Sequence, residues 1–593
     1  MAVSYQNWRG RPVQVPDETL AVVLGALGDN GAPVADAPRD GSAGSAAAAF
    51  PARRSWGFGV QLYSVRSRAS WGHGDLHDLA DLAAWSGGPL GADFVLVNPL
   101  HAAEPQPPVS PSPYLPMSRR QISPLYLRVE DIPEYQGLSA GDRARVEALA
   151  APLRAASRTA ALIDRDAVWA AKRTALELIH AVRLTAGRRA EFDAFLSRDR
   201  RAVEDWAAWC ALAEVHGPDW RSWPAALTDP GSARVAELRR ALADRIEFHA
   251  WLQWLAEEQL TAAQQAARRA GMSIGVITDL AIGAHPGGAD AWARQDVIVP
   301  GMSVGAPPDE FNQRGQNWTL PPWHPGRLVA QAGRPLAELI AACARNAGGL
   351  RVDHVMGLAR LWWIPAGMSP ELGTYVRYDH ELMGGVLAAE VARADALAIG
   401  EDLGTVEPWL RKFLAGRHVL GTSMLWFERR ADGTPRRPGG WRRGCLATVG
   451  THDFPPAAAF LTGEQVTIRA KLGLLTQPEA EERAAAEAEM GQWLAMLGRE
   501  GLLSRPAGRP SPEEFTIALY GYLTRTPAVL IGVSLADAAG EQRPQNMPGT
   551  VDEYPNWRIP LTGADGRPVL LDDLPAHPGV RMVAEAVSGG LRG

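Results

Sequence analysis

Short apolar runs rich in β-branched residues recur along the chain from about residue 55 onward, and most of them end abruptly in polar or charged residues. Runs of this kind are typical of strands that are buried on both faces, as in a parallel sheet. Segments with helical spacing, such as residues 75–85, 335–347 and 378–396, lie between most of them. The eight runs are Gly57–Val65, Asp93–Leu100, Ser273–Leu280, Leu350–Val355, Leu397–Leu403, His418–Trp426, Leu446–Asp453 and Ala528–Ala536. Buried strands that alternate with helices predict an α/β fold, here a closed (β/α)8 TIM barrel, with a doubly wound open sheet as the alternative.

The spacing of these runs also predicts how the chain is organised around the barrel. Residues 1–54 are expected to form a small N-terminal extension, a short helix followed by an Ala-, Gly-, Ser- and Pro-rich linker, and residues 55–593 the barrel domain. The second and third strands are too far apart for one βα unit, and helical spacing between them predicts a mainly helical insertion over residues 128–270. After the third strand, residues 301–325 are punctuated by Pro and Gly, which predicts a long loop.

Composition and charge exclude several classes of function. The 593 residues carry 60 Lys and Arg against 66 Asp and Glu, a net charge of −6, so no basic excess is available to neutralise a nucleic acid. No apolar run is long enough to cross a bilayer, which predicts a cytoplasmic protein without a membrane partner. The three cysteines are far apart and none belongs to a CxxC pair, so neither a disulfide framework nor a structural zinc site is expected.

Tryptophan is unusually frequent, with 21 residues against 12 Phe and 10 Tyr. An indole ring offers a flat face on which a sugar can stack, but most tryptophans of any protein pack in its interior. In the predicted helical insertion, Phe248, Trp251, Leu252 and Leu255 are spaced to lie on one face of a helix. We therefore expect the tryptophans of the insertion to be structural; they include Trp169, Trp206, Trp209, Trp251 and Trp254.

Four carboxylates stand at the ends of predicted strands, which is where such barrels carry their catalytic groups. They are Asp279, Asp353, Glu401 and Asp453. A single carboxylate at a strand end is typical of a helix N-cap. Four on one rim repel one another, which is unfavourable unless they bind a substrate or share a proton. Paired carboxylates suit cleavage of a glycosidic bond, in which one attacks and another donates a proton. A metal-dependent hydrolase is the rival interpretation, but a histidine pair at i, i+4 lies just after the first strand, away from the carboxylates, so no metal is expected.

Three of these carboxylates lie in motifs that occur in the order LRVDHVMGLARLWWIP, AIGEDLGTV and GTHDFP. In this order the motifs resemble the nucleophile, acid/base and stabiliser segments of glycoside hydrolase family 77, the 4-α-glucanotransferases called amylomaltases or disproportionating enzymes. GVQLYSVRS, SPYLPMSRR, GAPPDEFNQRGQNWTLPPW and QNMPGTVDEYPNWR also resemble family segments, so the resemblance runs from about Trp56 to Arg558. The chain departs from the family at Phe454 and Pro456, where Leu and Thr are more usual, and its N-terminal extension is shorter than in the large bacterial members.

The resemblance implies roles for individual residues in a retaining reaction on α-1,4-glucans. Asp353 would be the nucleophile that forms a glycosyl-enzyme, Glu401 the general acid and then the general base, and Asp453 the group that holds sugar hydroxyls at the cleavage point. Arg351 faces the same side of its strand as Asp353 and would keep that carboxylate ionised. The other expected substrate contacts are Asp279, His354, His452, Tyr63, Tyr114 and Asn546.

For residues 301–325 the resemblance implies a loop that covers the cleft, with Gln316 and Trp318 facing the substrate and Trp362 or Trp363 as further candidates. Such a cover favours a sugar hydroxyl over water as the acceptor. The predicted activity is disproportionation, in which a fragment of a maltooligosaccharide or glucan passes to the 4-hydroxyl of another sugar, with glucose able to accept it. No cofactor is expected, and no oligomeric state is predicted. The alternatives are an α-glucan hydrolase that uses the same carboxylates and a non-catalytic glucan-binding barrel.

Overall fold

The computed structural model describes residues 1–6, 11–28, 53–309, 314–404, 406–503 and 509–592. At its centre eight parallel strands close into a barrel in the order β10-β13-β14-β15-β16-β3-β4-β7. The strands are β3 (Ser55–Val60), β4 (Phe94–Val97), β7 (Gly275–Leu280), β10 (Gly349–Val352), β13 (Leu397–Gly400), β14 (Val419–Met424), β15 (Cys445–Thr448) and β16 (Leu530–Ser534). Each overlaps one of the eight predicted runs, and β16 pairs with β3, which closes the sheet. The (β/α)8 barrel is therefore confirmed and the open sheet is wrong.

The barrel strands are almost wholly buried because both of their faces are covered. Side chains of β10 and β15 are buried at every position, as are those of β7 and β14. Val352 at the end of β10 pairs with Gly400 of β13 on one side and with Leu280 of β7 on the other. Residues that follow these three strands therefore emerge at the same height on the carboxyl-end rim of the barrel.

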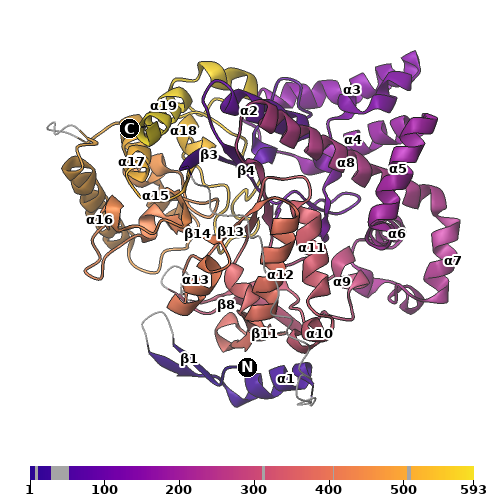
Figure 1. Ribbon diagram of the computed structural model, residues 1–593, viewed down its shortest axis with the longest axis horizontal. Coiled ribbons are helices and arrows are strands. Elements are labelled where there is room, and N and C mark those ends of the chain that lie inside the picture. Colours follow the sequence, from indigo (N-terminus) through magenta and orange to yellow (C-terminus); the bar gives the residue numbers. More distant parts are fainter. Residues whose placement is uncertain (7–10, 29–52, 310–313, 405, 504–508, 593) are drawn as a thin grey trace.

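The chain between β4 and β7 forms a helical layer on one side of the barrel (Figure 1). Its helices are α3 (Ala140–Ser157), α4 (Arg165–His180), α5 (Ala186–Arg198), α6 (Arg200–His216), α7 (Ala233–Ala241) and α8 (Ala243–Arg269). The spacing over residues 128–270 predicts helices but not where they break: α5 ends before α6, and α7 before α8, because the backbone leaves helical geometry at Asp199 (ψ 46°) and Leu242 (ψ 22°). The named tryptophans of this region are 0–4% exposed, so their structural role is confirmed.

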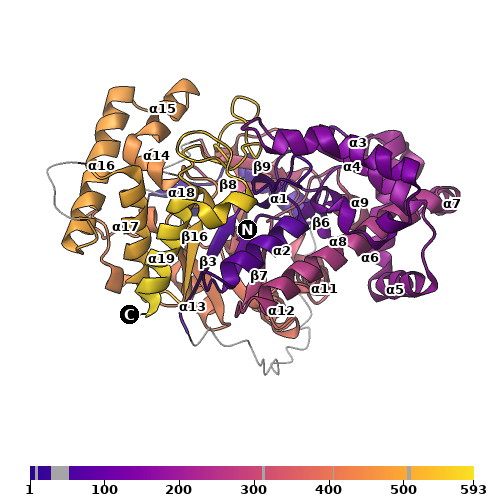
Figure 2. The same cartoon turned by 90° about the horizontal axis from the view of Figure 1, so that it is seen from above.

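A second helical group lies on the opposite side of the barrel (Figure 2). It consists of α14 (Ala457–Thr462), α15 (Glu464–Lys471), α16 (Glu479–Arg499) and α17 (Pro512–Thr524), all between β15 and β16. Trp493 of α16 is fully buried against Trp426 and Tyr522, which ties this group to the barrel core. The carboxyl-end rim thus lies between two helical flanks.

Residues 301–325, which we expected to be a loop, contain two strands. β8 (Met302–Ala306) and β9 (Gln316–Leu320) pair with each other, and β8 also pairs with β11 (Arg360–Pro365). With β12 (Thr374–Arg377) they form a four-stranded antiparallel sheet in the order β12-β11-β8-β9. β8 pairs with a strand far along the chain, and the Pro and Gly content of the segment favours a loop, so the local sequence did not reveal these strands. Residues 310–313 lie outside the described residues.

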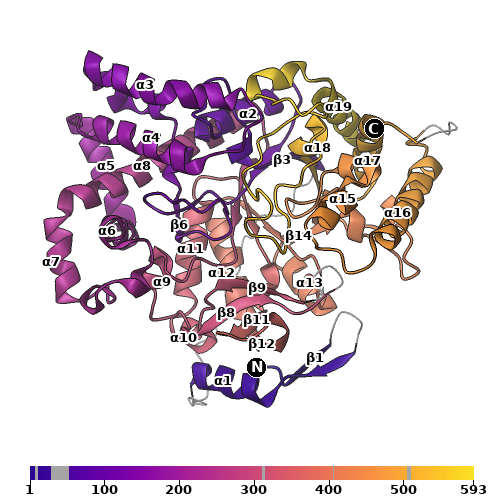
Figure 3. The ribbon, with the colours of Figure 1, turned by 180° about the vertical axis from the view of Figure 1, so that it is seen from behind.

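The N-terminal extension is also more than the helix that the sequence predicted. β1 (Ser4–Gln6) and β2 (Pro12–Gln14) pair ahead of α1 (Asp17–Leu27), and the unit packs against the four-stranded sheet (Figure 3). Val23 is fully buried there, and Thr19 donates to the carbonyl of Leu372. The predicted linker falls mostly on residues 29–52, outside the described residues. Within the described ranges no helix is long and apolar enough to cross a membrane.

Candidate active site

The carboxylates predicted from strand ends meet on one rim. Asp279 lies within β7, Asp353 directly follows β10, and Glu401 directly follows β13. Asp453 lies in a turn five residues after the end of β15 at Thr448. Because β7, β10 and β13 are neighbours in register, their carboxylates converge although the residues are far apart in sequence.

Arg351 joins two of these carboxylates. Its Nη1 donates to both oxygens of Asp279, at 2.6 and 2.7 Å, and its Nη2 donates to Oδ1 of Asp353 at 3.2 Å. The guanidinium is 9% exposed and the Asp353 side chain 19% exposed, so the pair is only weakly screened by water. Burial raises the pKa of Asp353 to about 6, and the positive charge of Arg351 limits this rise. The arrangement keeps one ionised carboxylate at the centre of the rim.

Glu401 is held by backbone donors. The N–H of His354 donates to Oε2 at 3.0 Å, and the N–H of Leu403 donates to Oε1 at 2.6 Å. Burial raises the pKa of Glu401 to about 7, and the nearby charge of Asp353 adds to the rise. Near neutral pH, Glu401 therefore holds a proton more readily than the adjacent Asp353. General acid catalysis requires such a difference between the acid and its neighbour.

Asp453 has polar partners of its own. Asn546 Nδ2 donates to Oδ1 at 2.7 Å, and His452 Nε2 lies 3.3 Å from Oδ2. Burial by itself raises the pKa of Asp453, but His452 and Asn546 outweigh it and bring this pKa down to about 2. The low pKa keeps this carboxylate ionised, and 43% of the side chain is exposed, so it is open toward a ligand.

Aromatic packing positions the histidine of this group. The Tyr114 ring stacks on His452 with centroids 4.6 Å apart, and its hydroxyl donates to Asp279 at 2.6 Å. Trp557 packs against both rings, at 5.4 Å from Tyr114 and 5.2 Å from His452. Trp557 was not singled out from the sequence; its place in the QNMPGTVDEYPNWR segment was the only signal.

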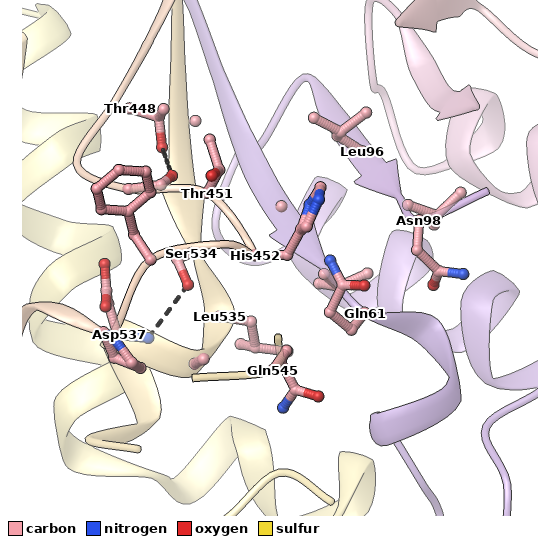
Figure 4. Close-up of a pocket in the computed structure, with 18 of the residues that line it drawn as sticks. Gln61, Leu96, Asn98, Thr448, Thr451, His452, Ser534, Leu535, Asp537 and Gln545 are labelled. Carbon is pink, nitrogen blue, oxygen red and sulfur yellow. Dashed lines mark hydrogen bonds between the residues drawn. The ribbon is translucent and has the colours of Figure 1, made fainter. Parts of the chain in front are cut away.

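Two cavities flank the Arg351 centre. The first cavity has a volume of about 130 Å³. It lies between residues at the ends of the first two barrel strands, β3 and β4, and residues at the ends of the last two, β15 and β16 (Figure 4). Gln61 and Asn98 line it on the β3 and β4 side, Thr448 and Ser534 on the β15 and β16 side, and His452 stands between them. The wall toward the carboxylates is formed by Tyr114, Asp279 and Arg351.

The second cavity, of about 90 Å³, lies under the four-stranded sheet and is lined by Asp353 and His354 together with Val304 and Leu320 of the β8–β9 hairpin. Trp318 of β9 meets the His354 ring edge-on, with centroids 5.2 Å apart. Gln316, two residues earlier on β9, accepts from the indole N–H of Trp318. The hairpin therefore brings Trp318, and Gln316 bonded to it, to the side of the rim that carries Asp353 and His354.

Three other predicted or considered residues lie elsewhere. Tyr63 is fully buried, with its hydroxyl donating to Gln545 at 2.9 Å, so it lies behind the wall of the first cavity. Trp362 and Trp363 are 1% and 0% exposed, and Trp362 packs against Tyr5 instead of facing the cleft. In the described part of the chain, no group of three or more His, Cys, Asp or Glu residues is arranged to hold a metal ion.

Comparison with known proteins assigns the chain to a family. A family model described as 4-alpha-glucanotransferase matches residues 60–565, which is most of the chain. The chain belongs to glycoside hydrolase family 77. It is therefore an enzyme of the 4-α-glucanotransferase class, and the resemblance seen in its motifs is confirmed.

Individual members of family 77 support the same assignment. A Mycobacterium tuberculosis 4-alpha-glucanotransferase is 54% identical over 545 residues, covering 90% of this chain and 75% of that protein. One from Haemophilus influenzae is 34% identical over 531 residues, covering 85% and 75%. The amylomaltase of Corynebacterium glutamicum superposes with a TM-score of 0.83 at 43% identity, over 90% of this chain and 75% of that one. Amylomaltase from Streptococcus agalactiae in complex with acarbose, at 18% identity and a TM-score of 0.71, shares the fold.

Proposed function

We propose that this family 77 enzyme cleaves α-1,4-glucosidic bonds by a retaining, two-step transfer through a covalent glycosyl-enzyme. The observation that carries the proposal is the unequal environment of two neighbouring carboxylates, Asp353 and Glu401. Asp353 has a guanidinium partner, whereas the hydrogen bonds that Glu401 accepts within the described residues come from backbone N–H groups, and its pKa is raised to about 7. A charged nucleophile beside a protonated acid is what retaining glycosidases require.

In the first step, an oxygen of Asp353 bonds to the anomeric carbon while the bond from that carbon to the leaving oxygen breaks. Glu401 gives its proton to this oxygen, so the reducing-end fragment leaves as a neutral alcohol. In the second step, the ionised Glu401 takes the proton of an incoming 4-hydroxyl, whose oxygen displaces Asp353 from the anomeric carbon. Two inversions leave the α configuration unchanged.

Asp453 is proposed to hold hydroxyls of the sugar at the cleavage point as its ring flattens toward an oxocarbenium ion. Its low pKa and its 43% exposure support this role, because an ionised and accessible acceptor is available to sugar hydroxyls. His354, whose pKa burial lowers to about 4, is neutral near pH 7 and can donate or accept. The other proposed substrate contacts are Arg351, Asp279, His452, Tyr114, Asn546, Gln316 and Trp318. Tyr63, buried behind the wall of the first cavity, is proposed to act there through its hydrogen bond to Gln545 and not by direct contact with the sugar.

We propose that the acceptor is a sugar, including glucose, rather than water. The β8–β9 hairpin supports this preference, since Trp318 lies beside His354 at the nucleophile and reduces the access of solvent. An α-glucan hydrolase with the same carboxylates is the competing outcome. The donors would be maltooligosaccharides and α-1,4-glucans, without a cofactor or metal, and a cytoplasmic location stays a prediction.

Incubation of the purified chain with maltotriose alone tests the proposal. Transfer yields glucose together with a ladder of longer maltooligosaccharides. Products no longer than maltotriose would indicate hydrolysis, and unchanged maltotriose would contradict catalysis on this substrate class. Addition of EDTA is expected to leave the ladder unchanged; a loss restored by Ca²⁺ or Zn²⁺ would contradict the metal-free mechanism.

A further inference from the structure

Trp409 is exposed on the rim of the barrel. It leaves 42% of its surface accessible, whereas the other large hydrophobic residues exposed in the described ranges are valines and leucines. It stands at the second position of α13 (Pro408–Ala415), the helix that follows β13. Exposure of an indole to water is unfavourable in free energy, because its surface is largely apolar, and a polar residue at this position would avoid that cost. The exposure of Trp409 therefore calls for an explanation.

The indole is held in one orientation by its neighbours. Its Nε1 donates to Oε2 of Glu407 at 2.6 Å. The rings of His380 and Phe413 approach at steep angles, 64° and 68°, with centroids 4.9 and 6.2 Å away, so neither stacks flat on the indole. A rigid ring loses little conformational entropy when a ligand binds, which is a property of binding platforms.

The position of Trp409 relates it to the catalytic rim. Helices of this barrel run antiparallel to its strands, so the start of α13 lies at the carboxyl ends where Glu401 stands. Glu407 also accepts from Nη1 of Arg360 at 3.0 Å, and Arg360 opens β11, seven residues after Asp353. The Arg360–Glu407 ion pair thus links the segment that follows Asp353 to the segment that follows Glu401. Trp409 is hydrogen-bonded to the carboxylate of the same Glu407.

The groups beside the ring suit an uncharged, hydroxyl-rich ligand. Glu407 and His380 are 39% and 38% exposed at the side chain, and Glu381 is 65% exposed. Carboxylates accept from neighbouring hydroxyls, and the imidazole can donate or accept. The C–H face of a glucose ring is apolar, so stacking it on the indole removes apolar surface from water on both partners.

We propose that Trp409, flanked by Glu407 and His380, is a second binding platform for α-glucan chains, on the rim and outside the two cavities of the catalytic centre. The identity of the sugar rests on the proposed function. The platform holds a distant part of a long glucan while another part occupies the cleft. Its contribution is an increase in affinity for polymers through a second contact on the same chain.

Native electrophoresis of the full chain through gels that contain amylose, together with initial rates of maltotriose disproportionation, tests this platform. Trp409→Ala is expected to weaken retardation by amylose, with a roughly tenfold rise in apparent Kd for loss of one central aromatic contact. Trp409→Phe, which keeps a smaller aromatic face, is expected to fall between this variant and the unaltered chain. The maltotriose rate should stay within about twofold of the unaltered chain, because this short donor is bound in the cleft.

Val215→Ala serves as the matched control, since Val215 is 66% exposed at the end of α6 in the helical insertion. It removes exposed apolar surface away from the platform and should leave retardation unchanged. Equal retardation of Trp409→Ala and the unaltered chain would overturn the platform, as would absence of any retardation of the unaltered chain. A parallel loss of maltotriose transfer in Trp409→Ala would also overturn it, because Trp409 would then act on the catalytic segments through Glu407. Failure of the proposed function is recognised separately, by the unaltered chain forming no products from maltotriose.

Discussion

The backbone N–H of His354 donates a hydrogen bond of 3.0 Å to Oε2 of Glu401, which joins the segment after β10 to the carboxylate after β13. His354 adopts a left-handed backbone conformation, with φ 45° and ψ 56°. Such a conformation costs a non-glycine residue about 1 kcal/mol or more and persists where surrounding structure enforces it. Here it turns the N–H of His354, the residue directly after Asp353, toward Glu401, so one piece of backbone sets the positions of both carboxylates.

The rate of transfer is expected to follow a bell-shaped dependence on pH, with its maximum between about 6 and 7. Activity falls at lower pH because Asp353, with a pKa of about 6, gains a proton and cannot attack. It falls at higher pH because Glu401, with a pKa of about 7, loses the proton that the leaving oxygen needs. The two apparent values describe the interacting pair as a whole. Initial rates of maltotriose transfer across pH 4–9 measure them, and a flat profile through this window would contradict the assignment.

Asp353→Asn is expected to abolish transfer while binding of maltooligosaccharides persists, because an amide keeps the shape of the carboxylate without its nucleophilic charge. Glu401→Gln should also stop transfer from maltotriose. The two variants differ on an α-maltosyl fluoride donor, since fluoride leaves without protonation. Fluoride release is expected from Glu401→Gln and not from Asp353→Asn. Release by both variants, or near-normal transfer by Asp353→Asn, would show that Asp353 is not the nucleophile.

Asn546→Ala is expected to lower kcat about tenfold, since a hydrogen bond to a charged group contributes about 1.5 kcal/mol or more. The variant removes the 2.7 Å bond to Asp453 and should raise the pKa of that carboxyl. Thr550→Ala is the control, because Thr550 accepts from Asn556 within the same segment and does not contact Asp453. Equal effects of the two substitutions on kcat would indicate general disturbance of the segment.

Arg128→Met is expected to destabilise the fold by about 3–5 kcal/mol, because it removes the ion-pair partner of two buried carboxylates. Arg128 Nε donates to Asp75 at 2.6 Å and its Nη2 to Asp78 at 2.8 Å, and both carboxylates are fully buried. Arg234→Met provides the comparison, since Arg234 pairs with Glu237 at 2.6 Å on the surface, 51% exposed. Surface pairs contribute about 0–1 kcal/mol. Thermal unfolding monitored by circular dichroism should show a clearly lower Tm for Arg128→Met alone.

The periodic pattern of the chain was sufficient to predict the barrel, because strands buried on both faces must be apolar at nearly every position. Helical spacing of apolar positions predicted the insertion, although not the breaks at Asp199 and Leu242. Strands β8 and β9 escaped prediction because β8 is stabilised by pairing with β11, a partner far along the chain, and β9 pairs in turn with β8.

The amino-acid sequence by itself determined which groups the rim contains, since Asp353, Glu401 and Asp453 follow directly from strand ends and ordered motifs. Only the tertiary structure decided how each group is tuned. The partners that set their charges, such as Asp279 through Arg351 and Asn546 for Asp453, come from other strands and segments. The tertiary structure also distinguished Trp409 in water from Trp362 in the core, because burial depends on what the rest of the fold places around a side chain. A tryptophan looks the same in both settings when only its sequence neighbours are known.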